Sequence, residues 1–368
     1  MSTVSAVIVN HNGGEQILRC LSALHRQQPA LAEVIVVDNG SSDASPAAIR
    51  ARFPEVQLIE LGDNLGPAAA RNAGLRRARS AFVLFVDDDV YLAQDCLRRL
   101  LERLARGEAV VAAPRLVLLP ESDLIQADGG DVHFTGTMTL RHGRARVADV
   151  APATQAIGAF SSSCLLADRE RVLEAEGFDE AYFIYQEDME LGLRLRSFGH
   201  RLICDAAAVA YHERGAGTPG LSFRDQGAYP RRRAFLTMRN RLRTLLVHYR
   251  LRSLVLLAPA LVIYEVVALA FAIRRGWLGS WCRAWGWQLA HLRDTLRRRR
   301  WVQARRQVDD GLLLVGGPIP LAPGVLSSPL ERKAAAGLAH VLDWYWRLIR
   351  PLIGGDRSTV VTKVSSGA

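Results

Sequence analysis

Three consecutive aspartates, Asp87, Asp88 and Asp89, are the residues whose type and spacing point most clearly to chemistry. Carboxylates this close together repel one another, so a cation or a network of hydrogen-bond donors must compensate their charge. Mg²⁺ typically binds one or two protein carboxylates and completes its octahedron with phosphate oxygens and water, and Mn²⁺ favours similar oxygen ligands. The cluster therefore predicts a site for Mg²⁺ or Mn²⁺ and a nucleoside diphosphate, with Asp88 turned away because side chains alternate along a strand.

Two further polar groups follow apolar runs, one starting at Asn10 and containing Asn12, the other starting at Asp38. These residue types are also common in ordinary turns and helix caps, so both interpretations stay open for these two loops. The sequence has no GxGxxG after the first apolar run and no GxxxxGK[ST] anywhere. This excludes a dehydrogenase of the dinucleotide-binding type and a P-loop enzyme.

The elements that must position these residues follow from the alternation of short apolar, β-branched runs with helical patterns. Strands are expected at residues 4–9, 33–37, 56–61 and 81–86. Helices are expected up to about residue 28, near 46–52, from Pro67, and over 93–106. This pattern is typical of an α/β fold in which a mostly parallel sheet is covered by helices on both faces. In such sheets ligands bind at the carboxyl ends of the strands, where the polar groups lie.

Composition limits the class of protein. The chain has 368 residues, of which 49% are hydrophobic and 23% charged, so we expect two folded modules rather than a disordered or disulfide-stapled chain. The five cysteines form no CxxC pair, which excludes a zinc finger and favours a reducing compartment. The first residues lack a secretory signal pattern, so most of the protein is expected in the cytosol.

Charge and aromatic residues divide the chain. Residues 231–306 contain 18 arginines and two acids, a net charge of +16, whereas the rest of the chain carries −6. All seven tryptophans follow residue 276. The glycine- and proline-rich residues 215–220 indicate a linker. We therefore expect a catalytic domain over 1–220, a helical Arg/Trp-rich membrane-associating region over 221–350 with a helix at 330–350, and a flexible tail over 351–368.

The longest apolar run, residues 254–273, is long enough to cross a membrane. A single crossing would place ten arginines on the side opposite the catalytic domain, against the positive-inside tendency, and Pro259 and Glu265 interrupt the run. Interleaved arginines and tryptophans favour a monotopic or re-entrant attachment to an anionic membrane surface, at its cytoplasmic face. A buried core helix or an oligomer interface is the alternative, and nucleic-acid binding is not favoured.

Five segments carry a resemblance to a known family: VIVNHN, VIVVDNGSSD, NLGPAAARNAGLRRAR, VLFVDDDV and GFDEAYFIYQEDMELGLRLRSFGHRL. Their order and spacing over residues 1–215 resemble the inverting family 2 glycosyltransferases, which have the GT-A fold. Within that family the chain is similar to bacterial rhamnosyltransferase-like enzymes. Many of those carry an Asn-Pro-Asp motif where this chain has three aspartates, so the resemblance leaves the donor sugar open.

The resemblance implies roles for several residues on the donor side. Residues implied at the nucleotide are Asn10, Asn12, Asp38, Asn64, Arg71 and Asp87. Asp89 is implied as the metal ligand, with His212 near the metal and the diphosphate. The alternative for Arg71 is a solvated charge on a helix, and the alternative for His212 is a structural hydrogen bond.

On the acceptor side, an inverting transfer needs a base that deprotonates the acceptor hydroxyl. The resemblance implies Asp188 in this role, supported by Glu187 and by Asp179 and Tyr185 in an acceptor wall that also includes Tyr182 and Phe183. The alternatives are that the two acids only favour the positive end of the helix that follows them, and that the aromatic rings belong to the core.

The sequence thus predicts an inverting transferase that moves a single sugar from a nucleoside diphosphate sugar, dTDP-rhamnose being one candidate, to a lipid-linked glycan acceptor in cell-surface polysaccharide synthesis. A sugar nucleotidyltransferase and a non-catalytic membrane adaptor are the alternatives. A processive synthase is not expected, because the QxxRW motif is missing. No nucleic-acid partner is expected, and a homo-oligomer stays open.

Overall fold

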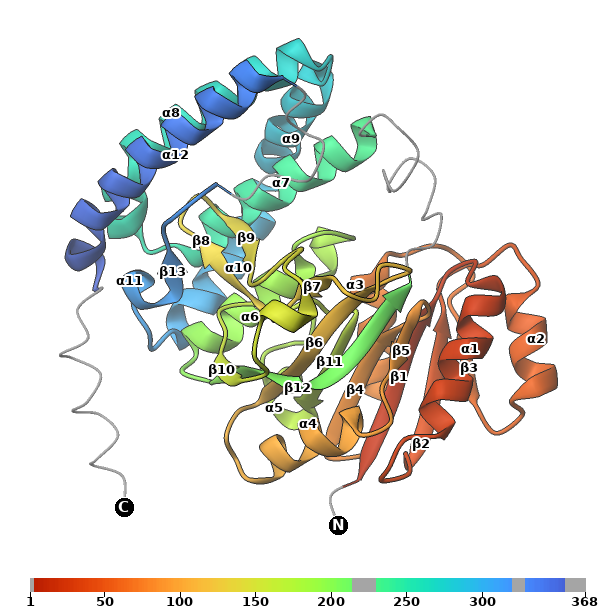
Figure 1. Ribbon diagram of the computed structural model, residues 1–368. Helices are drawn as coiled ribbons and strands as arrows, with labels where there is room; N and C mark the ends of the chain where they lie inside the picture. The colour runs from red at the N-terminus through yellow and green to blue at the C-terminus, as the bar shows by residue number, and fades with distance from the viewer. Residues whose placement is uncertain (1–2, 214–229, 320–327, 355–368) are drawn as a thin grey trace.

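The computed structural model describes residues 3–213, 230–319 and 328–354. The four expected strands form the parallel half of the central sheet, in the order β3-β2-β1-β4. They are β1 (Val4–Asn10), β2 (Glu33–Asp38), β3 (Gln57–Glu60) and β4 (Phe82–Asp87). The expected helices follow them: α1 (Gly14–His25), α2 (Ser45–Arg52), α3 (Pro67–Arg77) and α4 (Cys96–Ala105). The sequence prediction is confirmed for this half of the fold (Figure 1).

The second half of the sheet is mixed. Strand β11 (Cys164–Asp168) runs antiparallel to β4 and to β6 (Val111–Leu119), and β12 (Leu202–Glu213) runs parallel to β6. The shorter strands of this sheet are β5 (Val90–Leu92), β7 (Ile125–Ala127) and β10 (Thr154–Ala156). Between β11 and β12 lie α5 (Arg169–Glu174), the 3₁₀ turn η2 (Glu180–Tyr182) and α6 (Glu187–Ser197). Another 3₁₀ turn, η1 (Val147–Asp149), precedes β10. The parallel strands expected from the sequence thus form one half of a sheet that is mixed as a whole.

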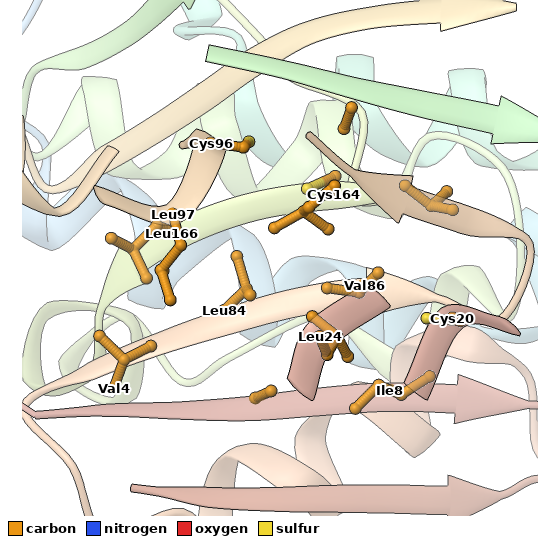
Figure 2. Close-up of a cluster of buried hydrophobic side chains, with 14 of the residues drawn as sticks. Val4, Ile8, Cys20, Leu24, Leu84, Val86, Cys96, Leu97, Cys164 and Leu166 are labelled. Carbon is orange, nitrogen blue, oxygen red and sulfur yellow. The ribbon is translucent and has the colours of Figure 1, made fainter. Parts of the chain in front are cut away.

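Both faces of the sheet are buried, which is why its strands are continuously apolar rather than alternating. Figure 2 shows one face, where Ile8 and Val86 pack against Leu24 of α1 and where Leu97 of α4 covers the same layer. Four of the five cysteines are buried in the two core clusters, and Cys282 is exposed. All five are free thiols, in line with the prediction of a protein without a disulfide framework.

The C-terminal part is mostly helical and packs onto the α/β part. Its elements are α7 (Arg231–His248), α8 (Leu251–Arg274), α9 (Leu278–Ala290), α10 (Leu292–Arg305), α11 (Asp310–Leu313), β13 (Leu314–Val315), α12 (Pro329–Ile349) and η3 (Arg350–Ile353). Strand β13 pairs with β8 (Gly130–His133), which also pairs with β9 (Thr137–Leu140). Because the two parts share a sheet, we do not expect the region before residue 220 to fold alone. The predicted linker at 215–220 and most of the predicted tail lie outside the described residues.

Helix α8 contains the apolar run and is the one described helix that is long and apolar enough to cross a membrane. Only 11% of its most apolar window is buried, so the core-helix alternative is wrong. Glu265, which interrupts the run, accepts hydrogen bonds from Arg241 (2.7 Å) and from the indole nitrogen of Trp281 (2.9 Å). Its charge is therefore compensated within the protein. Helices α8 and α12 lie side by side, joined by a hydrogen bond from Tyr345 to the Leu256 carbonyl (Figure 1).

Candidate active site

A cavity of about 1140 Å³ opens at the carboxyl ends of β1 and β4. Its wall brings together residues that are far apart in the sequence, among them Asp87, Asp89, Asp188 and His212. This is the position that the parallel strand order predicts for a ligand site. The cavity then continues between α7, α8 and α12, well beyond the strand ends.

Asp89 and His212 form a pair at the cavity wall, with His212 Nε2 3.2 Å from Asp89 Oδ1. Strand β5 positions them, because it pairs antiparallel with the end of β12 and the amide of Glu213 donates to the Asp89 carbonyl at 2.8 Å. Within the described ranges no three His, Cys, Asp or Glu side chains converge on one point. Two protein ligands on one wall nevertheless fit a Mg²⁺ or Mn²⁺ ion whose remaining ligands are phosphate oxygens and water.

Asp88 does not point away from the site, so that expectation is wrong. It lines the cavity, and its Oδ2 accepts a hydrogen bond from the His11 amide at 3.2 Å. Burial and the charge of Asp89 raise the pKa of Asp88 well above its ordinary value. A Cβ at Gly13 would lie 2.7 Å from Asp88 Oδ2 and 2.5 Å from Asn10 Oδ1, so only glycine fits there. Asp88 thus joins the ends of β1 and β4.

Arg71 of α3 bridges the two acidic groups of the site. Its guanidinium donates to Asp87 at 2.6 Å and to Glu187 at 3.1 Å, and it lies over the ring of Phe178. The residue is 3% exposed, so the alternative of a solvated helix charge is wrong. Because its hydrogen bonds go to protein carboxylates, the structure gives it a positioning role, and its contact with the nucleotide stays a prediction.

Glu187 and Asp188 begin α6 and lie in different surroundings. Glu187 is 5% exposed, whereas Asp188 is partly exposed at the cavity wall and accepts hydrogen bonds from the amides of Met189 (2.7 Å) and Ser162 (3.4 Å). Burial, together with the neighbouring Asp188 charge, raises the pKa of Glu187 to about 8, and burial also raises the pKa of Asp188. The raised pKa of Glu187 favours its neutral form at neutral pH.

The segment just before α6 has an unfavourable backbone. Phe183, Tyr185 and Gln186 have φ angles of 62°, 71° and 67°, in the left-handed region that favours glycine. Such residues persist only where the surrounding structure fixes them, and they are concentrated at functional sites.

Asn240 of α7 fixes this segment. Its fully buried side-chain amide lies within hydrogen-bond distance of three carbonyl oxygens, those of Tyr182 (3.0 Å), Ile184 (2.9 Å) and Tyr185 (2.7 Å). The neighbouring Arg239 donates to the Tyr182 carbonyl at 2.6 Å. The helical C-terminal part therefore holds the loop that leads directly into Glu187 and Asp188.

On the donor side, the structure brings some of the predicted residues to the cavity and not others. Asn12 and Asn64 line it. Asn10 and Asp38 do not; both are buried, and Asn10 Nδ2 donates to Asp38 Oδ1 at 2.7 Å. Asp38 also accepts from the amide of Ser41 at 3.0 Å. Both residues thus support the loop behind the cavity wall, and their contact with the base stays a prediction.

The predicted acceptor wall is only partly formed. Tyr185 lines the cavity and stacks with Arg233, whose guanidinium carbon is 4.4 Å from the ring centre. Asp179 does not line the cavity; it caps η2 and pairs with Arg243 at 3.0 Å. Tyr182 is fully buried with its hydroxyl against Thr244, so it belongs to the core rather than to the wall.

Several cavity residues were not predicted. The polar run Ser161–Ser163 lies directly before β11 and at the cavity wall, and a polar segment preceding a buried strand was a signal that could have indicated it. His11 lines the cavity and contacts the Asn39 carbonyl at 2.9 Å. Arg233 at the cavity wall and Asn240, which is buried behind the wall, lie in the arginine-rich region, which the sequence indicated only as a membrane-associating surface.

Comparison with known proteins identifies this domain. Residues 5–135 match the family model "Glycosyl transferase family 2". The succinoglycan biosynthesis protein ExoO of Rhizobium meliloti (strain 1021) is 30% identical over 226 residues, which are 57% of this chain and 61% of that protein. The chain thus contains a glycosyltransferase family 2 domain over residues 5–135. Within this family it is also 29% identical, over 58% of its length and 76% of the relative's, to the N-acetylglucosaminyl-diphospho-decaprenol L-rhamnosyltransferase of Mycobacterium tuberculosis (strain ATCC 25618 / H37Rv).

Solved structures show the same fold at low sequence identity. Residues 1–349 of S. aureus TarS, in complex with UDP-GlcNAc, match with a TM-score of 0.52 and 17% identity over 95% of this chain and 92% of that one. GalNAc-T7 with UDP, GalNAc and Mn²⁺ matches with a TM-score of 0.53 and 17% identity over 67% of this chain and 48% of that one. The predicted GT-A fold of the family 2 enzymes is thereby confirmed.

Proposed function

We propose that this family 2 glycosyltransferase moves one sugar, with inversion, from a nucleoside diphosphate sugar to a glycan acceptor on a polyprenyl diphosphate, in cell-surface polysaccharide synthesis. The observation that carries the proposal is that Asp188 and the Asp89–His212 pair face one cavity. A carboxylate that could act as the base and a pair that could hold the diphosphate through a metal ion therefore line the same cavity. The names of two relatives, one in succinoglycan biosynthesis and one acting on a diphospho-decaprenol, support the acceptor class.

The donor end of the cavity suits a metal-bound diphosphate. Asp89 and His212 would hold a Mg²⁺ or Mn²⁺ ion, which when bound supplies positive charge to the diphosphate that leaves. GalNAc-T7, of similar fold, was solved with Mn²⁺. Asn12 and Asn64 offer amide groups to the nucleotide side. A deoxythymidine diphosphate rhamnose is one candidate donor, because one relative is a rhamnosyltransferase.

The acceptor end needs a base with its lone pair free for the acceptor hydroxyl. Asp188 would accept that proton as the new glycosidic bond forms on the face of the sugar opposite the leaving diphosphate. The amides of Met189 and Ser162 hold its carboxylate in place, and protonated Glu187 adds no second negative charge. Arg71 fixes the distance between Asp87 on the donor side and Glu187 on the acceptor side.

The reaction is tested by mass spectrometry of the products. The full-length protein is incubated with a panel of nucleoside diphosphate sugars and a glycan on a polyprenyl diphosphate. We expect the acceptor to gain the mass of one sugar while one nucleoside diphosphate is released. A nucleotidyltransferase would instead convert a nucleoside triphosphate and a sugar 1-phosphate into a nucleotide sugar, and a non-catalytic adaptor would give no product. Either result would reject the proposal.

Membrane attachment at the cytoplasmic leaflet is part of the proposal. Helix α8 exposes a row of apolar residues, including Val262 (60% exposed) and Val266 (61% exposed), and neighbouring α12 exposes Trp344 (67%). The exposed arginines of α9 and α10, among them Arg283, Arg293 and Arg300, add attraction to anionic headgroups, roughly 1 kcal/mol each near the surface. An enzyme held there would meet a lipid-carried acceptor by diffusion in two dimensions.

Liposome flotation of the full-length protein tests this attachment. Binding to anionic liposomes is expected to weaken at high salt without vanishing, since the apolar contribution is not screened. The double variant Val262→Glu, Val266→Glu should float poorly. Leu140→Glu, which changes an exposed leucine on β9, is the matched control. A wild-type protein that ignores anionic liposomes at low salt would contradict the attachment.

A further inference from the structure

The cavity is larger than sugar transfer at the strand ends requires, and part of its wall is apolar. Small-molecule pockets usually measure roughly 300–1,000 Å³, and this cavity, at about 1140 Å³, exceeds that range. Away from the strand ends its wall is formed largely by the C-terminal helices, together with Thr137 and Met138 of β9. We call the part lined by α7, α8 and α12 the helical chamber; the residues used below are Arg241, Ala268, Phe271, Ala335 and Leu338.

The helical chamber changes from charged to apolar along its length. At the strand ends the wall carries the carboxylates and amides described above. Arg233 of α7 comes next, and then Ala268 and Phe271 of α8 and Leu338 of α12 line the same cavity. The charged residues at this end are paired within the protein, Glu265 with Arg241 at 2.7 Å and Arg274 with Glu331 at 2.9 Å, so the rest of the wall there is apolar. A wall ordered as carboxylates, a guanidinium group and apolar side chains matches an amphiphile whose sugar, phosphate and hydrocarbon parts follow in that order.

The apolar end of the helical chamber also lies close to a surface from which a lipid could enter it. Both helices that form this end, α8 and α12, carry apolar residues on their outward sides, such as Val266 on α8 and Val341 on α12. An occupant that is hydrocarbon at this end would pass from the chamber to the same surface that we propose lies on the membrane. A water-soluble acceptor would leave this wall without a partner.

From this geometry we propose that the helical chamber binds the phosphate-proximal isoprenoid units of the polyprenyl diphosphate acceptor, with Arg233 at its diphosphate. The inference rests on the proposed function, which supplies the acceptor class. It adds that α7, α8 and α12 select the lipid, and that the lipid, once bound, places the terminal sugar beside Asp188. These helices would then contribute to acceptor specificity as well as to attachment.

Two neighbouring alanines on α12 offer a matched test. Ala335 lines the chamber, whereas Ala336 is exposed and is not part of the cavity wall. Ala335→Trp fills the chamber, and Ala336→Trp adds the same side chain on the solvent side. Acceptors with one glycan diphosphate head and either a short alkyl chain or a polyprenyl chain are compared. We expect Ala335→Trp to raise KM for the polyprenyl acceptor by about tenfold and to leave the short-chain acceptor nearly unchanged.

The outcomes separate this inference from the proposed function. If wild-type protein uses neither acceptor, the proposed function fails. If wild-type protein uses the polyprenyl acceptor and both tryptophan variants keep its KM, the helical chamber is not the lipid site and the inference fails alone. Equal loss with both acceptors would indicate a general disturbance of the site and would also overturn the inference. Ala268→Phe, on the facing helix, repeats the test should Ala335→Trp not fold.

A probe that does not depend on turnover completes the experiment. Farnesyl diphosphate with a photoreactive group on its last isoprenoid unit is irradiated with the full-length protein, and the labelled peptides are mapped. We expect labels at residues 267–271 and 334–338. An excess of unlabelled farnesyl diphosphate should remove these labels, whereas inorganic diphosphate or anionic phospholipid should leave them. Labels on the outward residues Val262 and Val266, or equal displacement by phospholipid, would show a general lipid surface instead and would overturn the inference.

Discussion

The guanidinium of Arg71 lies 2.6 Å from Asp87 and also pairs with Glu187 at 3.1 Å, so a single buried residue joins the donor and acceptor sides of the site. Its removal would leave the nearly buried Glu187 without its hydrogen-bond donor and Asp87 without its ion pair. Breaking a buried pair on one side typically costs about 3–5 kcal/mol. We expect Arg71→Met to lower the free energy of unfolding by an amount at the lower end of this range, because Asp87 is 29% exposed on its side chain.

Urea unfolding measures this difference. Arg76→Met is the control, since Arg76 lies on the same helix with 63% of its side chain exposed and only a 3.8 Å pair with Glu180. The control should change the unfolding free energy by less than about 1 kcal/mol. Equal effects of the two substitutions would show that the Arg71 bridge contributes no more to the free energy of unfolding than an exposed ion pair does.

Glu187 predicts a pH dependence of stability. Burial raises its pKa to about 8 from an ordinary 4.5, so the folded protein holds a proton that the unfolded chain has lost. Its contribution to stability is thus fully present below pH 4.5 and is lost as the pH rises through about 8. In urea unfolding, wild-type protein should lose stability relative to Glu187→Gln between pH 6 and pH 9. Parallel pH profiles for the two proteins would contradict the raised pKa.

Asp89 predicts metal-dependent donor binding. After a chelator has removed divalent metal ions, isothermal titration of UDP and dTDP into the protein should give a Kd at least tenfold higher. The reason is that the negative charge of the diphosphate then faces carboxylates without a cation between them. Asp89→Asn should bind weakly whether or not Mg²⁺ is present, while the exposed control Asp63→Asn should behave as wild type. If chelated wild-type protein binds the nucleotide unchanged and keeps full activity, the metal assignment is wrong.

The contacts of Asn240 predict that a residue of the C-terminal helices affects the rate of transfer by positioning the loop before Asp188. Asn240→Asp keeps the size of the side chain but replaces a donor to three carbonyls with an acceptor. The loop before α6 should relax and displace Asp188, and a displacement of about 1 Å can cost about a hundredfold in rate. We therefore expect a fall in kcat with unchanged donor affinity. A folded variant with normal kcat would remove Asn240 from the positioning role.

The sequence predicted the donor half of the fold because its strands are buried on both faces and read as unbroken apolar runs. The antiparallel β11 was not expected, since a short buried strand has the same composition in either direction. The structure confirms the strands that begin at Val4 and Phe82 and the helix that begins at Pro67. The sequence could therefore predict that Asp87 and Arg71 lie near the carboxyl ends of the strands.

The site itself was less predictable, because its contacts join segments far apart in the chain. Asp38 has the residue type of a ligand contact but pairs with Asn10 behind the wall, and Asp179 pairs with Arg243 of α7. Charge composition showed that residues 231–306 are basic. It could not show that Asn240 would be buried against the loop before Glu187, because that contact depends on how α7 packs on the catalytic domain.

The most direct test of the account is the kinetics of Asp188→Asn with the donor and acceptor that the product analysis identifies. The amide is nearly isosteric with the carboxylate but has little basicity, so kcat should fall by about 10²–10⁴ while the donor Kd stays close to wild type. This result would establish Asp188 as the base of the transfer. A variant with wild-type kcat, or one that loses donor binding and turnover in parallel, would contradict it.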